Sequence, residues 1–366
     1  MTIVVFFIVL AVLVLVHECG HFLFAKKFGI RVDEFGLGFP PKIWGKKYGE
    51  TEYTLNWVPF GGFVRIFGEN PDDASISGPD KARAMGHKAR WKQAIVLFGG
   101  IFFNFLFAWL LVSMAYALGT TASRESYARY SEYITGSHTM IVSVNQDSPA
   151  MKLDIRPGSI ITGITSKDIN ISEEELTIPV IKDVISRGNL VSLTYKNGKT
   201  ERTVDVQPEK GIIADTYAIG IAMQENVGTM KLPIHNAIWE GGKFTLYMIE
   251  GVFIGLYELV AGFIHGSPDL SAVSGPLGIA NMVGDSVQLG FAQLLMFTAL
   301  ISVNLGVINL VPFPALDGGR LFVLLIESIK RSPLKVQAIN TMNTIGFIVL
   351  LMIMLLVTLK DVLNYF

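Results

Sequence analysis

The chain has 366 residues, of which 51% are hydrophobic and only 17% are charged. Soluble chains carry roughly 25% charged residues, so this composition predicts a membrane protein. The near balance of 30 Lys and Arg against 31 Asp and Glu lacks the basic excess expected of a nucleic-acid binder, and we expect no nucleic-acid partner. A single cysteine excludes an intramolecular disulfide framework and a cysteine-based metal cluster, so any metal ligands must be His, Asp or Glu.

Four apolar segments are long enough to cross the roughly 30 Å hydrocarbon core of a bilayer. A fifth, residues 244–264, contains Glu250 and Glu258, which lie eight positions apart and therefore near one face of a helix. We interpret it as an interfacial amphipathic helix in contact with the lipid bilayer, not as a span. The sequence thus predicts a mainly α-helical polytopic membrane protein with four transmembrane helices, at residues 1–28, 94–119, 291–311 and 339–359.

Positive charge is distributed unevenly among the connections. Residues 26–92 hold 12 Lys and Arg, whereas the much longer segment 120–291 holds 13, and residues 320–335 add four more. The positive-inside rule therefore places residues 26–92 and the connection after the third span in the cytoplasm. The segment 120–291 and both termini are then expected outside.

Within the outer segment, residues 140–222 have the pattern of a compact α/β domain. Strands are predicted at 140–144, 159–164, 191–196 and 200–207, and a helix at 178–186. The string SPAMKLDIRPGSIITGI resembles the PDZ-domain signature, with Ser159 where aspartate is usual; another small α/β domain is the alternative. We therefore expect four regions: an N-terminal membrane half at 1–119, an extracytoplasmic PDZ-like domain at 120–228 with its core at about 140–222, an amphipathic helical linker at 229–290, and a C-terminal membrane half at 291–366.

The first span is interrupted by three ionisable residues in the sequence HECGH. His17 and His21 lie four positions apart, so their imidazoles lie within about 40° of each other around a helix and can bind one zinc ion. Glu18 can reach a zinc-bound water from beside the metal, whereas Cys19 points away. Ionisable residues in an apolar span are unfavourable unless they are functional or paired. The motif therefore predicts a catalytic Zn²⁺ site, in preference to two core histidines beside a buried glutamate.

A catalytic zinc ion normally takes three protein ligands and keeps its fourth position for water. The third span ends in the sequence NLVPFPALDGGR, which places Asp317 just beyond an apolar segment. Pro312 and Pro314 break the helix, so the chain can turn back and hold Asp317 near the depth of the histidines. Asp317 is therefore the predicted third ligand; the alternative is a helix-ending turn that Asp317 caps.

These motifs together resemble the site-2 protease family of intramembrane zinc metalloproteases, and within it the bacterial regulator-of-sigma-E protease type with a single PDZ-like domain. The resemblance rests on HECGH, NLVPFPALDG and the PDZ-like insertion, and it covers nearly the whole chain. The string GGIFFN looks like the family's G-P-x-x-N element, with Gly100 where proline is usual. The resemblance implies a membrane-reentrant β region at residues 35–67 and substrate-binding roles for Asn104 and Asn309. For Asn309, a hydrogen bond that stabilises the broken helix is an equal alternative.

The sequence therefore predicts a zinc metalloendopeptidase that hydrolyses peptide bonds of transmembrane segments within the bilayer, with Glu18 as the general base. An edge strand of the β region would pair with the unwound substrate. The resemblance implies regulated intramembrane proteolysis of single-span proteins, such as anti-sigma factors or residual signal peptides, in the bacterial inner membrane. The alternatives are a catalytically inactive PDZ scaffold or chaperone and a zinc transporter; neither has a need for Glu18 beside a complete ligand set.

Overall fold

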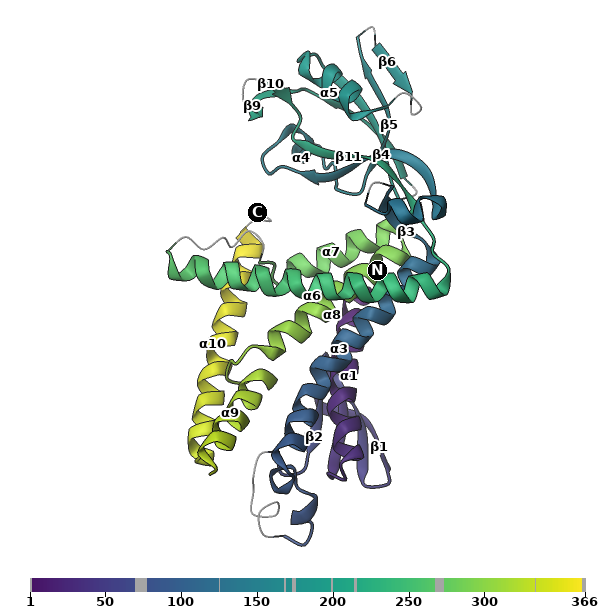
Figure 1. Ribbon diagram of the computed structural model, residues 1–366. Coiled ribbons are helices and arrows are strands. Elements are labelled where there is room, and N and C mark those ends of the chain that lie inside the picture. Colours follow the sequence, from purple (N-terminus) through teal and green to yellow (C-terminus); the bar gives the residue numbers. More distant parts are fainter. Residues whose placement is uncertain are drawn as a thin grey trace. The chain divides into compact units, whose positions relative to one another are not determined.

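The computed structural model describes residues 2–69, 78–124, 126–167, 169–172, 176–198, 200–213, 216–266, 273–332 and 334–363. The chain divides into two compact units (Figure 1). We call them the helical unit, which comprises Met1–Val112, Glu240–Gly284 and Met296–Phe366, and the sheet unit, which comprises Ser113–Trp239 and Asp285–Leu295.

Long apolar helices make up most of the helical unit, because a helix satisfies its backbone hydrogen bonds internally, as hydrocarbon requires. Large side chains of the last helix, such as Leu355 and Leu356, are 60% and 65% exposed, as suits contact with lipid. The chain is therefore a multi-pass membrane protein. Among the described residues, five helices are long and apolar enough to cross a membrane: α1 (Thr2–Lys27), α3 (Arg90–Leu118), α6 (Ile234–Ile264), α8 (Phe291–Leu310) and α10 (Val336–Leu363).

A small β-sheet follows α1 and packs against it. It is formed by β1 (Val32–Tyr48) and β2 (Thr51–Ile66), with an irregular register. Residues 34–37 of β1 pair with 52–55 of β2 on one side and with 62–65 on the other, so the end of β2 forms an edge of this sheet. The β region predicted at residues 35–67 is therefore present, while its entry into the membrane stays a prediction.

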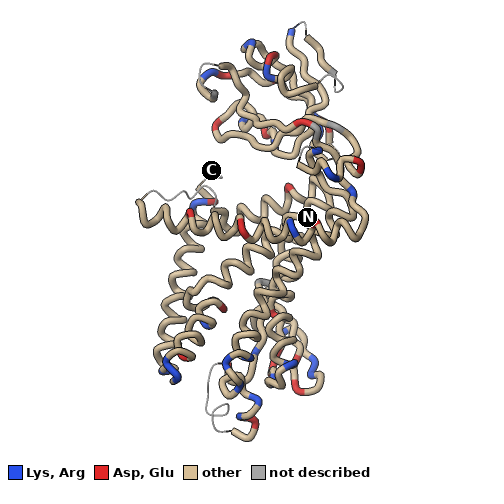
Figure 2. Tube along the Cα trace, viewed as in Figure 1, with Lys and Arg blue, Asp and Glu red and all other residues tan. Residues whose placement is uncertain are grey.

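Charged residues gather at one end of the helical unit (Figure 2). They lie in the β1–β2 sheet, around the short helices η1 (Lys81–Arg83) and η2 (Met85–His87), and where α9 (Asp317–Lys330) is followed by α10, whereas the middle parts of the long helices carry few. This distribution agrees with the expected cytoplasmic location of these connections, and the orientation stays a prediction.

Helix α6 differs from the other long helices in its direction. It lies crosswise to α3, α8 and α10 in Figure 1. Further along the chain, Asp285 of α7 (Pro276–Leu289) forms an ion pair of 2.7 Å with Arg156 of the predicted outer domain. The chain thus returns to the domain that it left before α6, as an even number of crossings by α6 and α7 would require. The 14 residues of α7 extend over about 21 Å, less than a membrane span. These observations favour the interfacial interpretation of residues 244–264, and four crossings stay a prediction.

We expect cysteines placed at Lys231 and His265, which flank α6 and are exposed, to react from the same side of the membrane. The background is Cys19→Ala, which removes the single native cysteine. Labelling of oriented vesicles with a membrane-impermeant maleimide measures the side, and a cysteine at Lys81 is the control for the opposite side. Labelling of positions 231 and 265 from opposite sides would make α6 a fifth span.

The sheet unit is an antiparallel sheet with one longer helix. In the residues described, the strand order is β3-β11-β4-β5-β7-β8, with β6 paired to β5, and β9 pairs separately with β10. Its elements are β3 (Thr120–Ser123), η3 (Ala128–Tyr133), β4 (Ile134–Val144), α4 (Pro149–Lys152), β5 (Ile160–Ser166), β6 (Ile169–Ser172), α5 (Ile178–Ser186), β7 (Val191–Asn197), β8 (Thr200–Val206), β9 (Glu209–Ile213), β10 (Thr216–Ala218) and β11 (Ile221–Met230).

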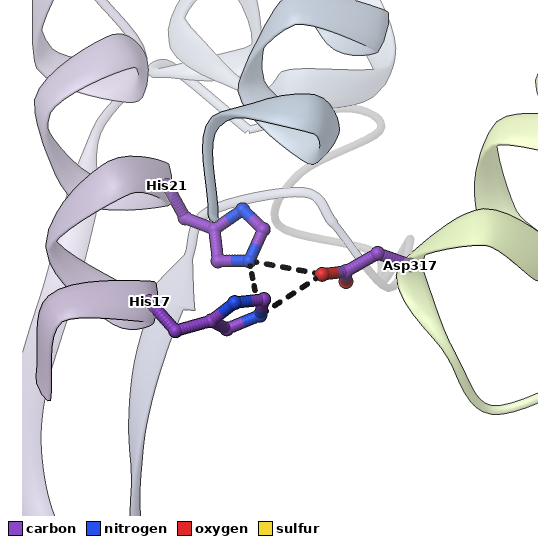
Figure 3. Close-up of side chains that lie close together, drawn as sticks. All are labelled: His17, His21 and Asp317. Atoms are coloured by element: carbon purple, nitrogen blue, oxygen red, sulfur yellow. Dashed lines mark hydrogen bonds and ion pairs between the residues drawn. The ribbon is translucent and has the colours of Figure 1, made fainter. Parts of the chain in front are cut away.

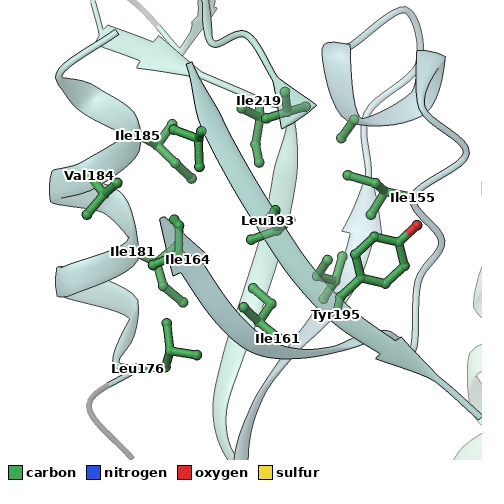
Figure 4. Packing of buried hydrophobic residues seen from close by; sticks show 14 residues of the cluster. Ile155, Ile161, Ile164, Leu176, Ile181, Val184, Ile185, Leu193, Tyr195 and Ile219 are labelled. Atoms are coloured by element: carbon green, nitrogen blue, oxygen red, sulfur yellow. The ribbon is translucent and has the colours of Figure 1, made fainter. Parts of the chain in front are cut away.

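The core of this unit lies between α5 and the sheet (Figure 4). Ile181 of α5 belongs to the same buried cluster as Ile161 and Leu193 of the central strands, and all three are fully buried. The predicted helix at 178–186 and the four predicted strands are confirmed, although β4 begins at Ile134, six residues before its predicted start. The strands β3, β6, β9, β10 and β11 were not predicted, and the PDZ-like character of the domain stays a prediction.

Candidate metal centre

Helices α1 and α3 approach so closely that their backbones touch. A Cβ added to Gly20 of α1 would lie 2.2 Å from the carbonyl oxygen of Gly99 in α3. Glycine is therefore required at this crossing, where any side chain would separate the helices. The close contact buries the neighbouring His17 and His21 against α3, and each is only 8% exposed.

Asp317 reaches the histidines because the chain reverses after α8. Residues 311–316 form a non-helical connection in which Ala315 has a left-handed φ of 73°, and α9 then begins at Asp317. A Cβ added to Gly318 would lie 2.3 Å from the carbonyl oxygen of Val311, so the connection packs directly on the first turn of α9. The helix cap is Leu316, so the structure does not support the alternative of Asp317 as a cap.

The side chains of His17, His21 and Asp317 point toward one another (Figure 3). The Oδ2 atom of Asp317 lies 3.0 Å from Nε2 of His17 and 3.2 Å from Nε2 of His21. The two Nε2 atoms lie 3.2 Å apart. The structure thus brings the three predicted ligands together, although Asp317 is 300 positions from His17 in the sequence.

The size of this triangle fits a zinc ion. Two ligands bound at about 2.0 Å with a tetrahedral angle lie roughly 3.3 Å apart, close to each of the three observed separations. Gly100 of α3 keeps the space beside the imidazoles open, because an added Cβ would lie 2.4 Å from Nε2 of His21. Two imidazoles and one carboxylate are also a donor set of catalytic zinc sites. The residues present therefore fit zinc.

A cavity of about 490 Å³ opens beside the three side chains. Glu18 lines it together with His17, His21 and Asp317. Glu18 therefore shares one cavity with the three predicted ligands, as a general base requires. The other lining residues come from β2, the segment after it, the α8–α9 connection, α9 and α10: Phe63, Val64, Ile66, Glu69, Ala315, Arg320, Asn343, Thr344 and Phe347.

The two asparagines that the sequence assigns to substrate binding lie outside this lining. Asn104 of α3 is fully buried, with its Nδ2 atom 3.0 Å from Nδ1 of His17. The side chain thus faces α1 behind the histidine, and its contact with substrate stays a prediction. Asn309 is partly buried in the last turn of α8 and does not line the cavity. Its contact with substrate stays a prediction.

Two features of the site were not predicted. The Nδ1 atom of His21 lies 2.8 Å from the backbone carbonyl oxygen of Val96, and a backbone group gives no sequence signal. Arg320 of α9 forms an ion pair with Glu69, which follows β2, and both line the cavity. Arg320 directly follows the DGG string and could have been found from that position, whereas Glu69 belongs to no motif.

We expect Gly100→Ala to lower zinc affinity by on the order of tenfold or more, because the new Cβ would displace the imidazole of His21. The matched control is Gly251→Ala in α6, where an added Cβ meets no atom within 4 Å. Competition with a chelator measures the affinity of both purified variants. Equal affinity of Gly100→Ala and the control would show that the site does not need this space.

Comparison with known proteins shows the relatives of this chain. The model of Peptidase family M50 matches residues 5–353. A protein of Clostridium perfringens that bears a zinc metalloprotease name is 35% identical over 356 residues, which cover 96% of this chain and 95% of that protein. The zinc metalloprotease RasP of Shouchella clausii is 27% identical over 444 residues, covering 100% of this chain and 99% of its own length.

Proposed function

This chain belongs to Peptidase family M50, the site-2 proteases, and is a membrane zinc metalloprotease; we propose that it hydrolyses peptide bonds within the transmembrane segments of single-span proteins. The resemblance to the site-2 protease family noted from the sequence is thereby confirmed. We further propose that His17, His21 and Asp317 are the zinc ligands and that Glu18 is the general base. The supporting observation is that the three ligand atoms lie within 4.8 Å of one another beside the cavity that Glu18 lines.

The proposed reaction adds water across a peptide bond and yields a carboxylate and an amine. Bound zinc supplies a Lewis acid that makes hydroxide available near neutral pH and polarises the scissile carbonyl. Glu18 takes a proton from the water and passes it to the leaving amine.

A transmembrane helix must unwind before it can be cut, because its peptide bonds are shielded by its own hydrogen bonds. Among the described residues, 62–65 of β2 pair with β1 along one edge only, and Phe63 and Val64 line the cavity. We propose that this edge accepts the unwound substrate as an added strand, which replaces the hydrogen bonds that the helix loses. Asn309 is proposed to bind the extended segment further along.

The substrates proposed from the family resemblance are anti-sigma-factor-like proteins and residual signal peptides. On the same basis we propose the bacterial inner membrane as the location, with residues 140–222 as an extracytoplasmic PDZ-like domain. An inactive scaffold would have no need of Glu18 in the metal cavity. A zinc transporter would have no need of the strand edge beside the site.

We expect Glu18→Gln to keep zinc and fold but to lose cleavage by roughly 10²–10⁴-fold, because the amide cannot accept a proton. His17→Ala should instead lose the zinc. Zinc content and cleavage of a single-span reporter in proteoliposomes measure both variants. Glu18→Gln activity within a few-fold of the native protein would assign Glu18 a structural role, and stoichiometric zinc in His17→Ala would contradict the proposed ligand set.

We expect a chain without the outer domain to cleave proteins that carry large ectodomains, if that domain excludes bulky substrates. The domain can be removed where β4 and β11 meet, because the backbone nitrogen of Asn145 lies 2.8 Å from the carbonyl oxygen of Gly220. In the deletion variant, an Asn-Gly turn replaces residues 146–219 and joins β4 to β11 as a hairpin. Cleavage of trimmed and untrimmed reporters measures the effect. Loss of trimmed-substrate cleavage with zinc still bound would mean that the domain recruits substrates.

A further inference from the structure

Asn104 contacts the nitrogen of His17 that faces away from the zinc ligands. Its Nδ2 atom lies 3.0 Å from Nδ1 of His17, while Nε2 of His17 faces Asp317 and His21. The Asn104 side chain is fully buried, and its Oδ1 atom has no hydrogen-bond partner among the described residues. A buried amide oxygen without a partner is destabilising and requires an explanation.

His21 shows how α3 serves the other histidine. The Nδ1 atom of His21 lies 2.8 Å from the backbone carbonyl oxygen of Val96. A carbonyl can only accept, so this contact fixes the proton on Nδ1 and leaves the lone pair of Nε2 for a metal. Val96 and Asn104 lie about two turns apart on α3. This helix therefore presents one group to the Nδ1 atom of each histidine.

We propose that Asn104 is a positioning residue that fixes the tautomer of His17. A half-turn of its amide exchanges Nδ2 and Oδ1, so that Oδ1 accepts the proton on Nδ1 of His17. The Nε2 atom then keeps its lone pair for zinc, whereas an amide N–H that donated to Nδ1 would leave the proton of His17 on Nε2 and block the metal. The inference rests on the proposed function, because it takes His17 as a zinc ligand.

A pair of substitutions separates this role from simple packing. Asn104→Asp keeps an acceptor with nearly the same shape, whereas Asn104→Leu keeps the volume and removes the acceptor. If Asn104 only filled space, Asn104→Asp would lower zinc affinity more than Asn104→Leu, because it buries a carboxylate. If Asn104 accepts the His17 proton, Asn104→Leu should lower zinc affinity more.

The experiment measures the zinc affinity of the purified full-length variants by chelator competition at one pH. We expect Asn104→Leu to bind zinc 10–100-fold more weakly, as for other groups that orient a ligand histidine, and Asn104→Asp to bind it about as tightly as the native chain. Excess zinc should restore cleavage by Asn104→Leu. The matched controls are Asn56→Leu and Asn56→Asp, because Asn56 is also buried and donates to a backbone carbonyl, that of Gly38, at 3.0 Å. Neither control should change zinc affinity.

Native zinc affinity in Asn104→Leu, or weaker binding by Asn104→Asp than by Asn104→Leu, would overturn the positioning role. Asn104→Ala, which also lacks an acceptor, takes the place of the leucine variant if that variant does not fold. His17→Ala is measured beside them. Unchanged zinc affinity in His17→Ala would contradict the proposed ligand set itself, whereas loss of zinc there with native affinity in Asn104→Leu would overturn only the role of Asn104.

Discussion

Polar groups inside the helical unit must find their partners within the protein, because hydrocarbon offers none. Two imidazoles and one carboxylate meet this constraint by sharing a triangle with sides of 3.0 to 3.2 Å. The Nδ1 atoms of both histidines contact groups of α3. These contacts are possible because Gly20 and Gly99 let the backbones of α1 and α3 touch. The close crossing of α1 and α3 therefore places partners beside the two histidines in addition to packing apolar side chains.

The same constraint explains why the non-helical connection before Asp317 is tolerated. Irregular backbone at membrane depth must be covered by protein. Helix α10 provides this cover, since an added Cβ at Gly346 would lie 2.5 Å from the carbonyl oxygen of Pro314. The backbone N–H of Ala315 also donates to Oδ1 of Asn343 in α10, at 3.3 Å. Contacts with α10 thus fix the position of the connection before Asp317, although α10 contributes none of the proposed ligands.

The local parts of this site could be predicted from the sequence, whereas its long-range parts could not. The spacing of His17 and His21 follows from the helical repeat alone, and α5 follows from its apolar pattern. Asp317 was predicted from the helix-breaking prolines and from the ligand that a catalytic zinc site with two histidines still lacks, because no local rule joins residues 300 positions apart. The contact of Asn104 with His17 was not predicted, because it depends on how α3 is rotated against α1. The pair Glu69–Arg320 depends on how the chain leaves β2, which no periodicity encodes.

The position of the β2 edge bears on the form in which a substrate reaches the proposed zinc site. A helical peptide bond is shielded by its own hydrogen bonds, whereas an extended strand exposes the carbonyl that must be polarised. Phe63 and Val64 of this edge line the same cavity as His17, His21 and Asp317. The hydrogen-bonding groups beside the site therefore favour an unwound segment.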